Sequence, residues 1–484
     1  MVHEVPTGTD ELVADLVAAI GPDRVLVGGG ARHLYGRDSS IIDGGHSGPV
    51  CFPDSTEQVA DCIRAAVAHG RDFVPRGAGT GLSGGAVPCN DPVVIATTRM
   101  NQIHEVDVER RIAWVGPGVV NLDLTRHLAG TGLHFAPDPS SQQACTIGGN
   151  TANNSGGPHC LAYGVTSAHV AAVEVVLSDA STVVLGEEVG DAVGYDLRGA
   201  FVGGEGTLGI ATRIAVRLTP DPPVVMTLLL DFKSIVDAAE AVTGIIAAGI
   251  VPAALEIMDQ KVVQAVEKFV SAGYPLDAGA VLIVELDGLP AGVAREVEIV
   301  KRVGADNGVG TVRVAADNAE RELIWKGRKN AFGAIAHIAP RYYLHDTVVP
   351  RTRLAEVIEK VNAAAERHDL IVMNVFHAGD GNLHPLLMFD PREPGTLERV
   401  HAAGEEIVRI AIEAGGVLSG EHGIGLEKRR FMSLLFSPDD LAAQRALRDA
   451  FDPLGRANPL KVFPTGASCG DVVGLTEIPE GVWV

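Results

Sequence analysis

The sequence has few cysteines, few aromatic residues and no secretion signal. Its six cysteines include no C-x-x-C pair, so neither a zinc finger nor an iron–sulfur cluster is indicated. Buried or incidental thiols in a reducing compartment are expected instead. The apolar run at residues 241–255 is too short to span a bilayer. The N-terminus has neither a basic nor an apolar region, so a cytoplasmic protein with no transmembrane segment is expected.

Basic residues are also scarce, because 39 lysines and arginines face 61 aspartates and glutamates, for a net charge of −22. Such a chain is repelled by nucleic-acid phosphates and by anionic membrane surfaces, so neither partner is expected. The 484 residues are enough for two or three domains with large cores. A hydrophobic share of 46% with 21% charged residues is typical of a soluble globular enzyme.

Glycine, in contrast, is concentrated in three stretches, residues 75–88, 138–166 and 203–209. Because glycine has no Cβ, its backbone can turn with positive φ and approach a ligand closely. Small polar side chains and successive N–H groups between the glycines can bind a diphosphate. Composition alone leaves a cofactor loop and an ordinary surface loop equally open for the central stretch. Three such stretches near strand-like runs predict one extended ligand that is contacted from several sides.

Residues 204–209, GEGTLG, match the G-x-G-x-x-G pattern of dinucleotide-binding sites. A Rossmann site requires a helix after the glycines and an acidic residue about 20 positions further on. Here residues 210–218 are strand-like and the acidic residue is missing. The motif therefore argues against a nicotinamide site.

The first 220 residues mix strands, short helices and glycine loops, which predicts an α+β domain ended by the proline-rich residues 219–223. Residues 171–177 and 182–185 predict a β-hairpin. The following region has a β-α-α-β-α-β order, which suits an antiparallel sheet covered by helices on one face. Its expected elements are strand 226–232, helices 235–248 and 259–269, strand 280–286, helix 291–304 and strand 310–314, followed by a helix at 318–336.

Residues 375–389, VFHAGDGNLHPLLMF, predict a second hairpin. One strand ends at His377, Asp380-Gly381 favours a tight turn, and His384 begins the next strand. This hairpin would place the two histidines opposite each other and aim both the same way. Two histidines so held suit a catalytic metal site that has one more ligand and an open position. A pair of structural histidines is the equally weighted alternative.

Residues 420–425, GEHGIG, offer the missing ligand. Glu421 together with His377 and His384 would bind zinc or another divalent cation. In the alternative interpretation, Glu421 is only the N-cap of a helix at 426–435. His422, next to the metal ligand, would act as a base.

Residues 325–332, WKGRKNAF, place Arg328 and Lys329 on a helix. Arginine is the side chain best suited to bind a carboxylate with two hydrogen bonds. A solvated basic face is the stronger interpretation for Lys329, whereas Trp325 and Phe332 flank Arg328. His345 and Asp346 are expected near the same pocket.

These motifs, in this order, resemble the FAD-linked 2-hydroxy-acid dehydrogenases of the vanillyl-alcohol oxidase fold, the family of the bacterial glycolate oxidase catalytic subunit and D-lactate dehydrogenase. The match runs from about residue 40 to 465. The resemblance implies an α+β chain with a two-part FAD-binding domain at residues 1–220. It also implies an antiparallel-sheet cap domain that binds substrate and metal at 221–430, and a helical segment returning to the flavin at 431–484.

By the same resemblance, the three glycine-rich stretches and the C-terminal N-P-L-K segment contact non-covalent FAD. Non-covalent FAD is expected because no histidine lies in residues 75–86, and His159 is the alternative that would carry a covalent flavin link. The family's N-P-G-K motif has Leu460 at its glycine position here. The expected FAD contacts are Pro75, Arg76, Gly77, Ala78, Gly79, Thr80, Gly81, Leu82, Gly84, Pro139, Ser140, Thr146, Gly148, Gly149, Asn150, Asn153, Ser155, Gly156, Gly157, Gly204, Glu205, Gly209, Ile210 and Asn458.

The implied reaction is the oxidation of a short 2-hydroxy acid, D-lactate or glycolate, to the 2-oxo acid, with hydride transfer from C2 to flavin N5. His422 would be the base and Arg328 would bind the substrate carboxylate. The expected ligands His377, His384 and Glu421 would hold zinc, with manganese, iron or cobalt as alternatives.

Three alternatives stay open. A D-2-hydroxyglutarate dehydrogenase is disfavoured by Leu344, where relatives with that substrate carry a lysine. A non-catalytic FAD subunit of an oxidase complex would not need the metal ligands. A sugar- or lactone-oxidising flavoenzyme of the same fold would not need Arg328.

The chain has no motif for a second redox centre, so reduced flavin requires a separate electron acceptor. An iron–sulfur subunit, an electron-transfer flavoprotein, a quinone and a cytochrome are the candidates. Such a partner could hold the protein at the periphery of a membrane, and a homodimer is a further assembly left open.

Overall fold

The computed structural model describes residues 9–42, 45–188 and 193–464, which divide into two compact units. Unit 1 comprises Met1–Gly156, Val165–Pro220 and Glu421–Val484, and unit 2 comprises Gly157–Gly164 and Asp221–Gly420. The short segment Gly157–Gly164 thus packs with unit 2, although its neighbours on both sides belong to unit 1. Cys469 and the end of the predicted C-terminal segment lie outside the described residues.

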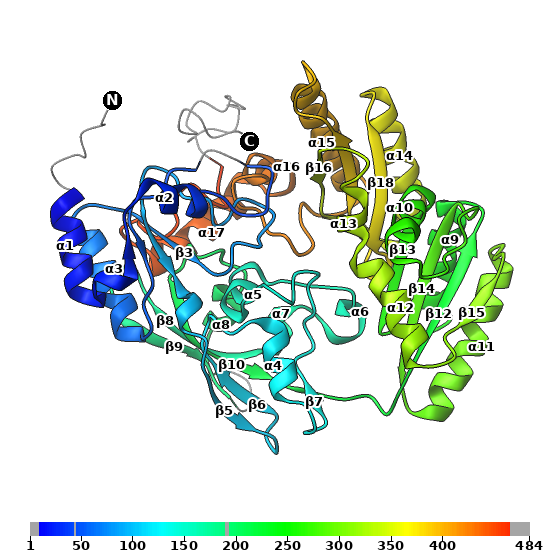
Figure 1. Cartoon of the computed structure of the whole chain (residues 1–484), viewed down its shortest axis with the longest axis horizontal. Helices are drawn as coiled ribbons and strands as arrows, with labels where there is room; N and C mark the ends of the chain where they lie inside the picture. Colours follow the sequence, from blue (N-terminus) through cyan, green and yellow to red (C-terminus); the bar gives the residue numbers. More distant parts are fainter. Residues whose placement is uncertain (1–8, 43–44, 189–192, 465–484) are drawn as a thin grey trace. The chain divides into compact units, whose positions relative to one another are not determined.

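Unit 1 is built on two main sheets (Figure 1). The first has the order β1-β2-β4-β3, with parallel pairing of β2 and β3 to β4. The second, β5-β6-β10-β8-β9, is antiparallel, and its β8–β9 pair confirms the predicted hairpin. The strands are β1 (Val25–Leu26), β2 (Val50–Cys51), β3 (Phe73–Arg76), β4 (Val93–Ala96), β5 (Ile103–Asp107), β6 (Ile112–Val115), β7 (Leu133–His134), β8 (Val170–Val176), β9 (Thr182–Gly186), β10 (Ile210–Arg217) and β11 (Thr219–Pro220).

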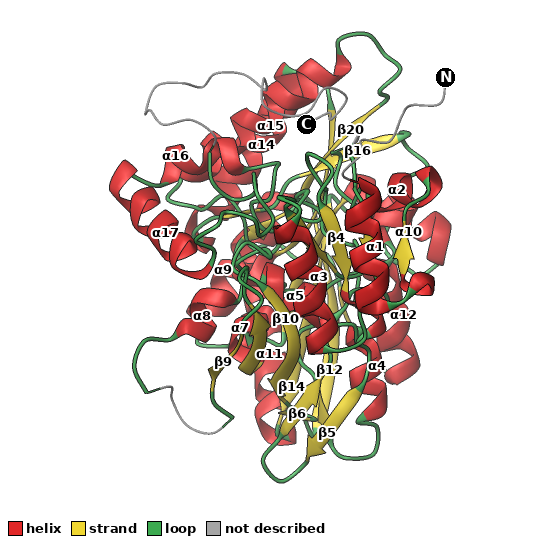
Figure 2. Ribbon diagram, turned by 90° about the vertical axis from the view of Figure 1, so that its left-hand side faces the viewer, coloured by secondary structure: helices red, strands yellow, loops and turns green. Residues whose placement is uncertain are grey.

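Helices close the two hydrophobic cores of unit 1. Helices α1 and α3 lie side by side (Figures 1 and 2), and their apolar faces pack with Phe73 of the parallel sheet. A second core joins the antiparallel sheet to Leu124 of α4 and Ile147 of α5. The helices of this unit are α1 (Thr9–Ile20), α2 (Gly29–Tyr35), α3 (Thr56–Ala68), α4 (Asn121–His127), α5 (Ile147–Asn153), α7 (Thr166–His169), α8 (Leu197–Phe201), α16 (Met432–Leu435) and α17 (Pro438–Phe451).

Unit 2 is organised around one large antiparallel sheet with the order β15-β12-β14-β13-β18-β19-β17, and β18 also pairs with β20, which pairs with β16. Its strands are β12 (Val224–Phe232), β13 (Ala254–Asp259), β14 (Ala280–Gly288), β15 (Val312–Val314), β16 (Arg341–Leu344), β17 (Thr347–Val348), β18 (Ile371–His377), β19 (Asn382–Leu383) and β20 (Pro385–Phe389). Its helices are α6 (Cys160–Tyr163), α9 (Ile235–Ala247), α10 (Gln260–Val270), α11 (Pro290–Asp306), α12 (Asn318–Lys329), α13 (Ala331–Ile335), α14 (Leu354–Arg367) and α15 (Thr396–Glu413).

The predicted order of this region missed strand β13. The observed order is β12-α9-β13-α10-β14-α11-β15, so the sheet continues through residues that lacked a strand assignment. Five of the six β13 residues are buried, so the strand shows no alternation of apolar and polar residues. The predicted helix at 318–336 is also divided, because α12 ends at Lys329 and α13 begins at Ala331.

Helices lie on both faces of this sheet, not on one face as predicted. A Cβ at Gly304 of α11 would lie 3.0 Å from the side chain of Leu230, so α11 packs on the Leu230 face of β12. Thr227, three residues earlier on β12, points to the opposite face. There its neighbour Glu285 receives hydrogen bonds from α12. A sheet covered on both sides buries the polar groups of both faces, and these groups then require partners.

Candidate functional site

The first glycine-rich stretch continues directly from β3. Gly79 has φ of 74°, and a Cβ there would lie 2.2 Å from the guanidinium of Arg76, so packing requires glycine. Gly81 and Gly85 differ, since a Cβ at either position would meet no protein atom closer than 3.6 Å. Protein packing alone does not require glycine at these two positions. Their bare backbone is consistent with close approach of a ligand.

The central stretch is not the single loop that its composition indicates. It contains α5, α6 and α7, and the side chain of Thr146 caps α5 by accepting a hydrogen bond from Gly149 N at 3.2 Å. Gly148 is required by packing, because a Cβ would lie 2.5 Å from Pro117. After Gly156 the chain passes to unit 2 and returns at Val165. The expected contacts Thr146–Gly156 thus belong to unit 1, whereas Gly157 belongs to unit 2.

The third stretch is tied to the other loops of unit 1 through Glu205. Its buried carboxylate accepts hydrogen bonds from the backbone N–H groups of Ile424 at 2.6 Å and Gly425 at 2.7 Å. The side chain of Asn458 donates to the carbonyl oxygens of Gly85 and Glu205. Burial raises the pKa of Glu205. The observed role of these two expected FAD contacts is to join loops, and strand β10 follows Gly209 where a Rossmann site would have a helix.

Several buried polar atoms of unit 1 have no hydrogen-bond partner among the described residues. They include Asn150 Nδ2 and Ser83 Oγ in the glycine-rich stretches, and Asn458 Oδ1 and Lys461 Nζ in the C-terminal segment. Burial lowers the pKa of Lys461. Buried polar groups are nearly always satisfied in native proteins. A bound polar molecule that supplies both donors and acceptors, such as FAD, fits this set.

The histidine pair lies in unit 2, and both side chains are at most 3% exposed. His377 ends β18 and pairs across the sheet with Asn382, not with His384 as predicted. His384 is the diagonal neighbour, two residues further along, and therefore lies on the same face of the sheet. The ring centroids are 5.0 Å apart with an angle of 87° between the planes. The two side chains thus lie on the same face of the sheet, as predicted, but they are diagonal neighbours and not direct cross-strand partners.

The Nδ1 atoms of both rings face acceptors of the chain itself. His377 Nδ1 lies 2.7 Å from Glu256 Oε1, and His384 Nδ1 lies 3.4 Å from the carbonyl oxygen of His345. Carboxylates and carbonyls only accept, so each Nδ1 carries the proton in these contacts. A cation bound by either ring would then be held through Nε2.

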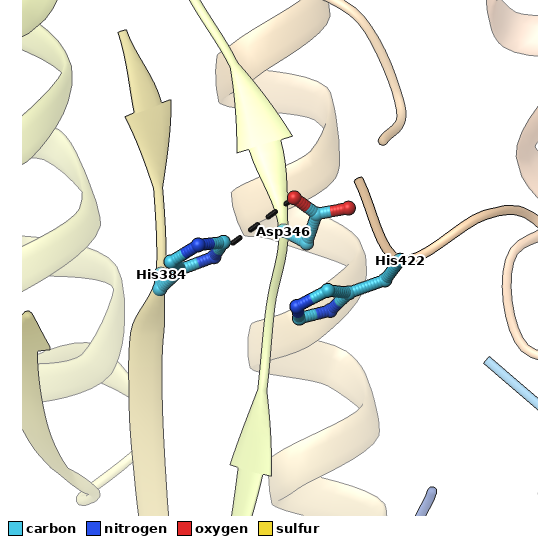
Figure 3. Close-up of side chains that lie close together, drawn as sticks. All are labelled: Asp346, His384 and His422. Carbon is cyan, nitrogen blue, oxygen red and sulfur yellow. Dashed lines mark ion pairs between the residues drawn. The ribbon is translucent and has the colours of Figure 1, made fainter. Parts of the chain in front are cut away.

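Asp346 lies beside His384 and binds Ser419 and Gly420, the last two residues of unit 2. Its Oδ1 is 3.9 Å from His384 Nδ1, and its Oδ2 accepts hydrogen bonds from Ser419 Oγ and from Gly420 N at 3.0 Å. In Figure 3 a dashed line marks the approach of Asp346 to His384.

Glu421 and His422 directly follow Gly420, so the covalent chain tethers them to this place. Within unit 1, the side chain of Asn153 donates to the carbonyl oxygen of His422 at 3.0 Å. Two possible ligand groups share His384, namely His377–His384–Glu421 and Asp346–His384–His422. Glu421 and His422 belong to unit 1, whereas the other members of both groups belong to unit 2. No helix begins at 422–426, so the structure does not favour the N-cap alternative for Glu421.

Arg328 is buried in α12, with 1% of its surface exposed, and its guanidinium is bound to Glu256. Arg328 Nε donates to Glu256 Oε2 at 2.8 Å, and Nη2 lies 2.7 Å from the same oxygen. Glu256 therefore connects Arg328 to His377.

A family model described as FAD linked oxidases, C-terminal domain, matches residues 221–462, which is half of the chain. A second model, FAD binding domain, matches residues 49–186. The chain belongs to the FAD-linked oxidases. Among the described residues of this FAD-linked oxidase, no helix is both long and apolar enough to cross a membrane.

Relatives in this family match over most of their length. The glycolate oxidase subunit GlcD of Escherichia coli K12 is 44% identical over 422 residues, covering 87% of this chain and 85% of the relative. The subunit of the same name from Bacillus subtilis is 37% identical and covers 95% and 98%. The D-lactate dehydrogenase of Anaerostipes hadrus is 33% identical and covers 92% and 95%.

Solved structures confirm the predicted fold class of this FAD-linked oxidase. Substrate-bound p-cresol methylhydroxylase superimposes with a TM-score of 0.81 at 16% identity, covering 96% of this chain and 99% of the other. A 4-ethylphenol oxidase from Gulosibacter chungangensis gives a TM-score of 0.77 at 17% identity, with coverage of 96% and 99%. These neighbours have the vanillyl-alcohol oxidase fold, with an FAD-binding domain and an antiparallel-sheet domain.

The sequence interpretation did not single out Glu256, because its strand was missed. A signal was present, since Glu256 is the single charge within the apolar run Ala254–Met258. A charge inside a buried strand requires a partner of opposite charge or a hydrogen-bond donor.

Proposed function

We propose that this FAD-linked oxidase converts a short 2-hydroxy acid, D-lactate or glycolate, to the corresponding 2-oxo acid. The observation that carries the proposal is the buried histidine pair of unit 2, whose Nδ1 atoms have acceptors within the chain. Glu421 and His422 are joined to this unit by the peptide bond that follows Gly420. Relatives named glycolate oxidase subunit and D-lactate dehydrogenase support the substrate class. Bound FAD would supply the hydride acceptor.

In this proposal His377, His384 and Glu421 hold one divalent cation, with zinc as the first choice. Two imidazole nitrogens and one carboxylate are a common zinc set, and three protein ligands leave a position for substrate. Such a cation, when bound, lowers the pKa of a hydroxyl group that contacts it. Manganese, iron and cobalt accept the same ligands, so a metal analysis of the purified protein decides among them.

His422 is the proposed base for the substrate hydroxyl. Its backbone carbonyl is held by Asn153, and the preceding backbone is held by Asp346 through Gly420. Fixing the backbone on both sides limits the positions that the imidazole can reach, which is the requirement for a general base. Asn153 would thus have two roles, because it is an expected FAD contact and it would also position the base His422.

The substrate side chain is proposed to be small and apolar. Leu344, at the position where relatives acting on 2-hydroxyglutarate carry a lysine, is buried. A buried leucine offers no charge to a second carboxylate, so a monoacid is favoured.

Electrons are proposed to leave the flavin for a separate acceptor. The E. coli and B. subtilis relatives are named as subunits of glycolate oxidase. A partner subunit with its own redox centre is the corresponding proposal here, with a flavoprotein, quinone or cytochrome as alternatives.

Anaerobic reduction of the bound flavin tests the proposed reaction. The purified FAD-loaded protein is mixed with D- and L-lactate, glycolate, D-malate and D-2-hydroxyglutarate, with and without a chelator. We expect D-lactate or glycolate to bleach the flavin absorption, the chelator to abolish bleaching, and a divalent cation to restore it. Dithionite, which reduces flavin without the site, serves as the control. Bleaching by none of the acids in protein that contains FAD and metal contradicts the proposal.

A further inference from the structure

A row of polar side chains crosses one face of the unit 2 sheet. Thr227 of β12 pairs with Glu285 of β14, and Glu256 of β13 pairs with His377 of β18. Glu256 pairs with Ile283, so Glu285 is its diagonal neighbour and points to the same face. All four side chains are buried. We name these four residues the polar row.

Helix α12 supplies the donors for both glutamates of the polar row. Arg321, Trp325 and Arg328 follow one another at i, i+4 and i+7, which places them on one helix face. Arg321 and Trp325 bind Glu285, whereas Arg328 binds Glu256. The helix therefore assigns one arginine to each buried carboxylate.

The two oxygens of Glu256 have separate partners. Oε2 receives Arg328 Nε at 2.8 Å and lies 2.7 Å from Nη2, while Oε1 lies 2.7 Å from His377 Nδ1. Glu256 and Arg328 are at most 1% exposed, so water does not compete for these contacts. The opposite charge of the buried guanidinium compensates the desolvation of the buried carboxylate.

We infer that Glu256 is a positioning residue for the metal ligand His377, and that Arg328 acts through Glu256. The hydrogen bond to Oε1 keeps the proton of His377 on Nδ1 and fixes the ring plane. Nε2 then presents its lone pair in one direction, and the carboxylate makes the imidazole more basic. This inference rests on the proposed metal site.

The inference changes the role that the sequence indicated for Arg328. Two of its nitrogens already contact one carboxylate oxygen of the protein. A guanidinium used in this way orients Glu256. The two roles of Arg328 make different predictions for metal binding in the absence of substrate.

Metal affinity of the full-length, FAD-loaded protein tests the inference. Metal is removed with a chelator, and Zn²⁺ binding is measured by competition with a chromophoric chelator in the wild type and in Glu256→Gln. We expect Glu256→Gln to weaken Zn²⁺ binding by about 10- to 100-fold, the usual effect of losing such a carboxylate. Co²⁺ in place of Zn²⁺ provides a second readout, because its visible spectrum reports ligand geometry.

Glu285→Gln is the matched control, since it neutralises the neighbouring buried carboxylate on the same face. We expect its Zn²⁺ affinity to stay at the wild-type value even where the melting temperature falls. Equal losses of Zn²⁺ affinity in both variants would overturn the inference, because they would indicate general loosening of the sheet. Flavin content is measured in each preparation to show that the chain is folded.

Glu256→Asp keeps the inference testable if Glu256→Gln does not fold. Aspartate retains the charge next to Arg328, but its carboxylate is one methylene further from His377. We expect weaker Zn²⁺ binding than wild type with the same flavin content, and wild-type affinity would contradict the inference.

Arg328→Gln separates the two roles of Arg328. For a positioning residue, Zn²⁺ affinity falls without substrate present. For a substrate-binding residue, Zn²⁺ affinity stays unchanged and only the Kd of oxalate, a mimic of the oxidised acid, rises; that result overturns the role of Arg328. A wild-type protein that binds no stoichiometric Zn²⁺ would overturn the proposed metal site and this inference together. Wild-type binding with unchanged Glu256→Gln affinity overturns the inference alone.

Discussion

Two buried glutamates on neighbouring strands, Glu256 and Glu285, have similar surroundings and different connections. Both lie on the same face of the unit 2 sheet, and both receive an arginine from α12. Glu285 is enclosed by Thr227, Arg321, Trp325 and His159, with contacts of 2.5–3.1 Å. Glu256 has Arg328 on one oxygen and the proposed metal ligand His377 on the other.

The difference shows that burial and charge pairing alone do not mark a functional group. The donors of Glu285 come from β12, α12 and the segment Gly157–Gly164, so this carboxylate fastens three parts of unit 2 together. Tyr163 of the same segment donates to Asp287, and His159 stacks on Trp325 with 5.4 Å between the ring centroids. Glu285 is therefore structural, whereas Glu256 connects the fold to the site. Paired substitutions at the two glutamates test this distinction.

The largest expected difference is between substitutions of the two cross-strand partners of the glutamates, His377 opposite Glu256 and Thr227 opposite Glu285. His377→Ala removes a proposed metal ligand, and we expect the rate of flavin reduction by substrate to fall at least about 100-fold, since metal assistance amounts to several kcal/mol. Thr227→Val removes one hydrogen bond to Glu285, and we expect an unchanged rate. Stopped-flow absorbance of the flavin measures both variants, and equal losses would show that the polar row acts as one unit.

The next largest effect concerns the stability that the ion pair between Arg321 and Glu285 contributes. Arg321→Gln leaves the buried carboxylate without its charged partner, and we expect about 1.5–3 kcal/mol less stability, typical of hydrogen bonds to charged groups. Urea unfolding followed by tryptophan fluorescence measures the change. Lys301→Gln, which removes the exposed pair with Glu298, is the control and should cost less than about 1 kcal/mol.

Acid should reduce the contribution of Glu285 to the free energy of unfolding. Burial alone raises the pKa of Glu285, but hydrogen bonds from His159 and Arg321 outweigh burial, so the pKa in the folded chain lies well below the ordinary 4.5. The stabilisation from a lowered carboxylate pKa is complete above pH 4.5 and is lost as the pH falls below it. We expect the stability difference between wild type and Glu285→Gln to shrink as the pH is lowered from 6 to 3. Melting temperatures at each pH measure it, and a constant difference would contradict the assignment.

The smallest expected effect comes from Trp325→Phe. This change removes the Nε1–H that donates to Glu285 at 2.5 Å but keeps an aromatic ring next to His159. The buried carboxylate retains its other donors, so we expect a loss of about 1 kcal/mol in the free energy of unfolding. Chemical denaturation measures it, with Zn²⁺ affinity expected to stay unchanged. A loss of Zn²⁺ affinity in this variant would show that the surroundings of Glu285 also influence the proposed metal site, which contradicts the separate roles of the two glutamates.

The fold class was predictable because local patterns and the order of motifs were informative. Apolar runs at 171–177 and 182–185, on either side of the turn residues 178–181, predicted the β8–β9 hairpin, which the structure confirms. The same approach missed β13, because its short apolar run at 254–258 is interrupted by Glu256. The helix at 318–336 was expected to be continuous, and the observed break after Lys329 was not visible in its helical pattern.

The candidate site was predictable as a set of residues and not as a network. His377 and His384 could be paired from the turn between them, but the diagonal register emerged only from the β18–β19 pairing. Arg328 was predicted to bind a substrate carboxylate, because arginine suits carboxylates and Trp325 and Phe332 flank it in the sequence. Its partner Glu256 lies 72 residues away on β13, and the packing of α12 on this face of the sheet brings the two together.

By itself, the sequence determined the fold class, the family resemblance and the identities of the chemically capable residues, because periodicity, glycine spacing and ordered motifs are local properties of the chain. The tertiary structure decided which of these groups face one another. Burial makes every unpaired charge costly, so each carboxylate in the sheet takes the donor that the strand order and the face of α12 place within reach. For this reason Glu256 joins Arg328 to His377, whereas Glu285, its diagonal neighbour on β14, holds parts of unit 2 together.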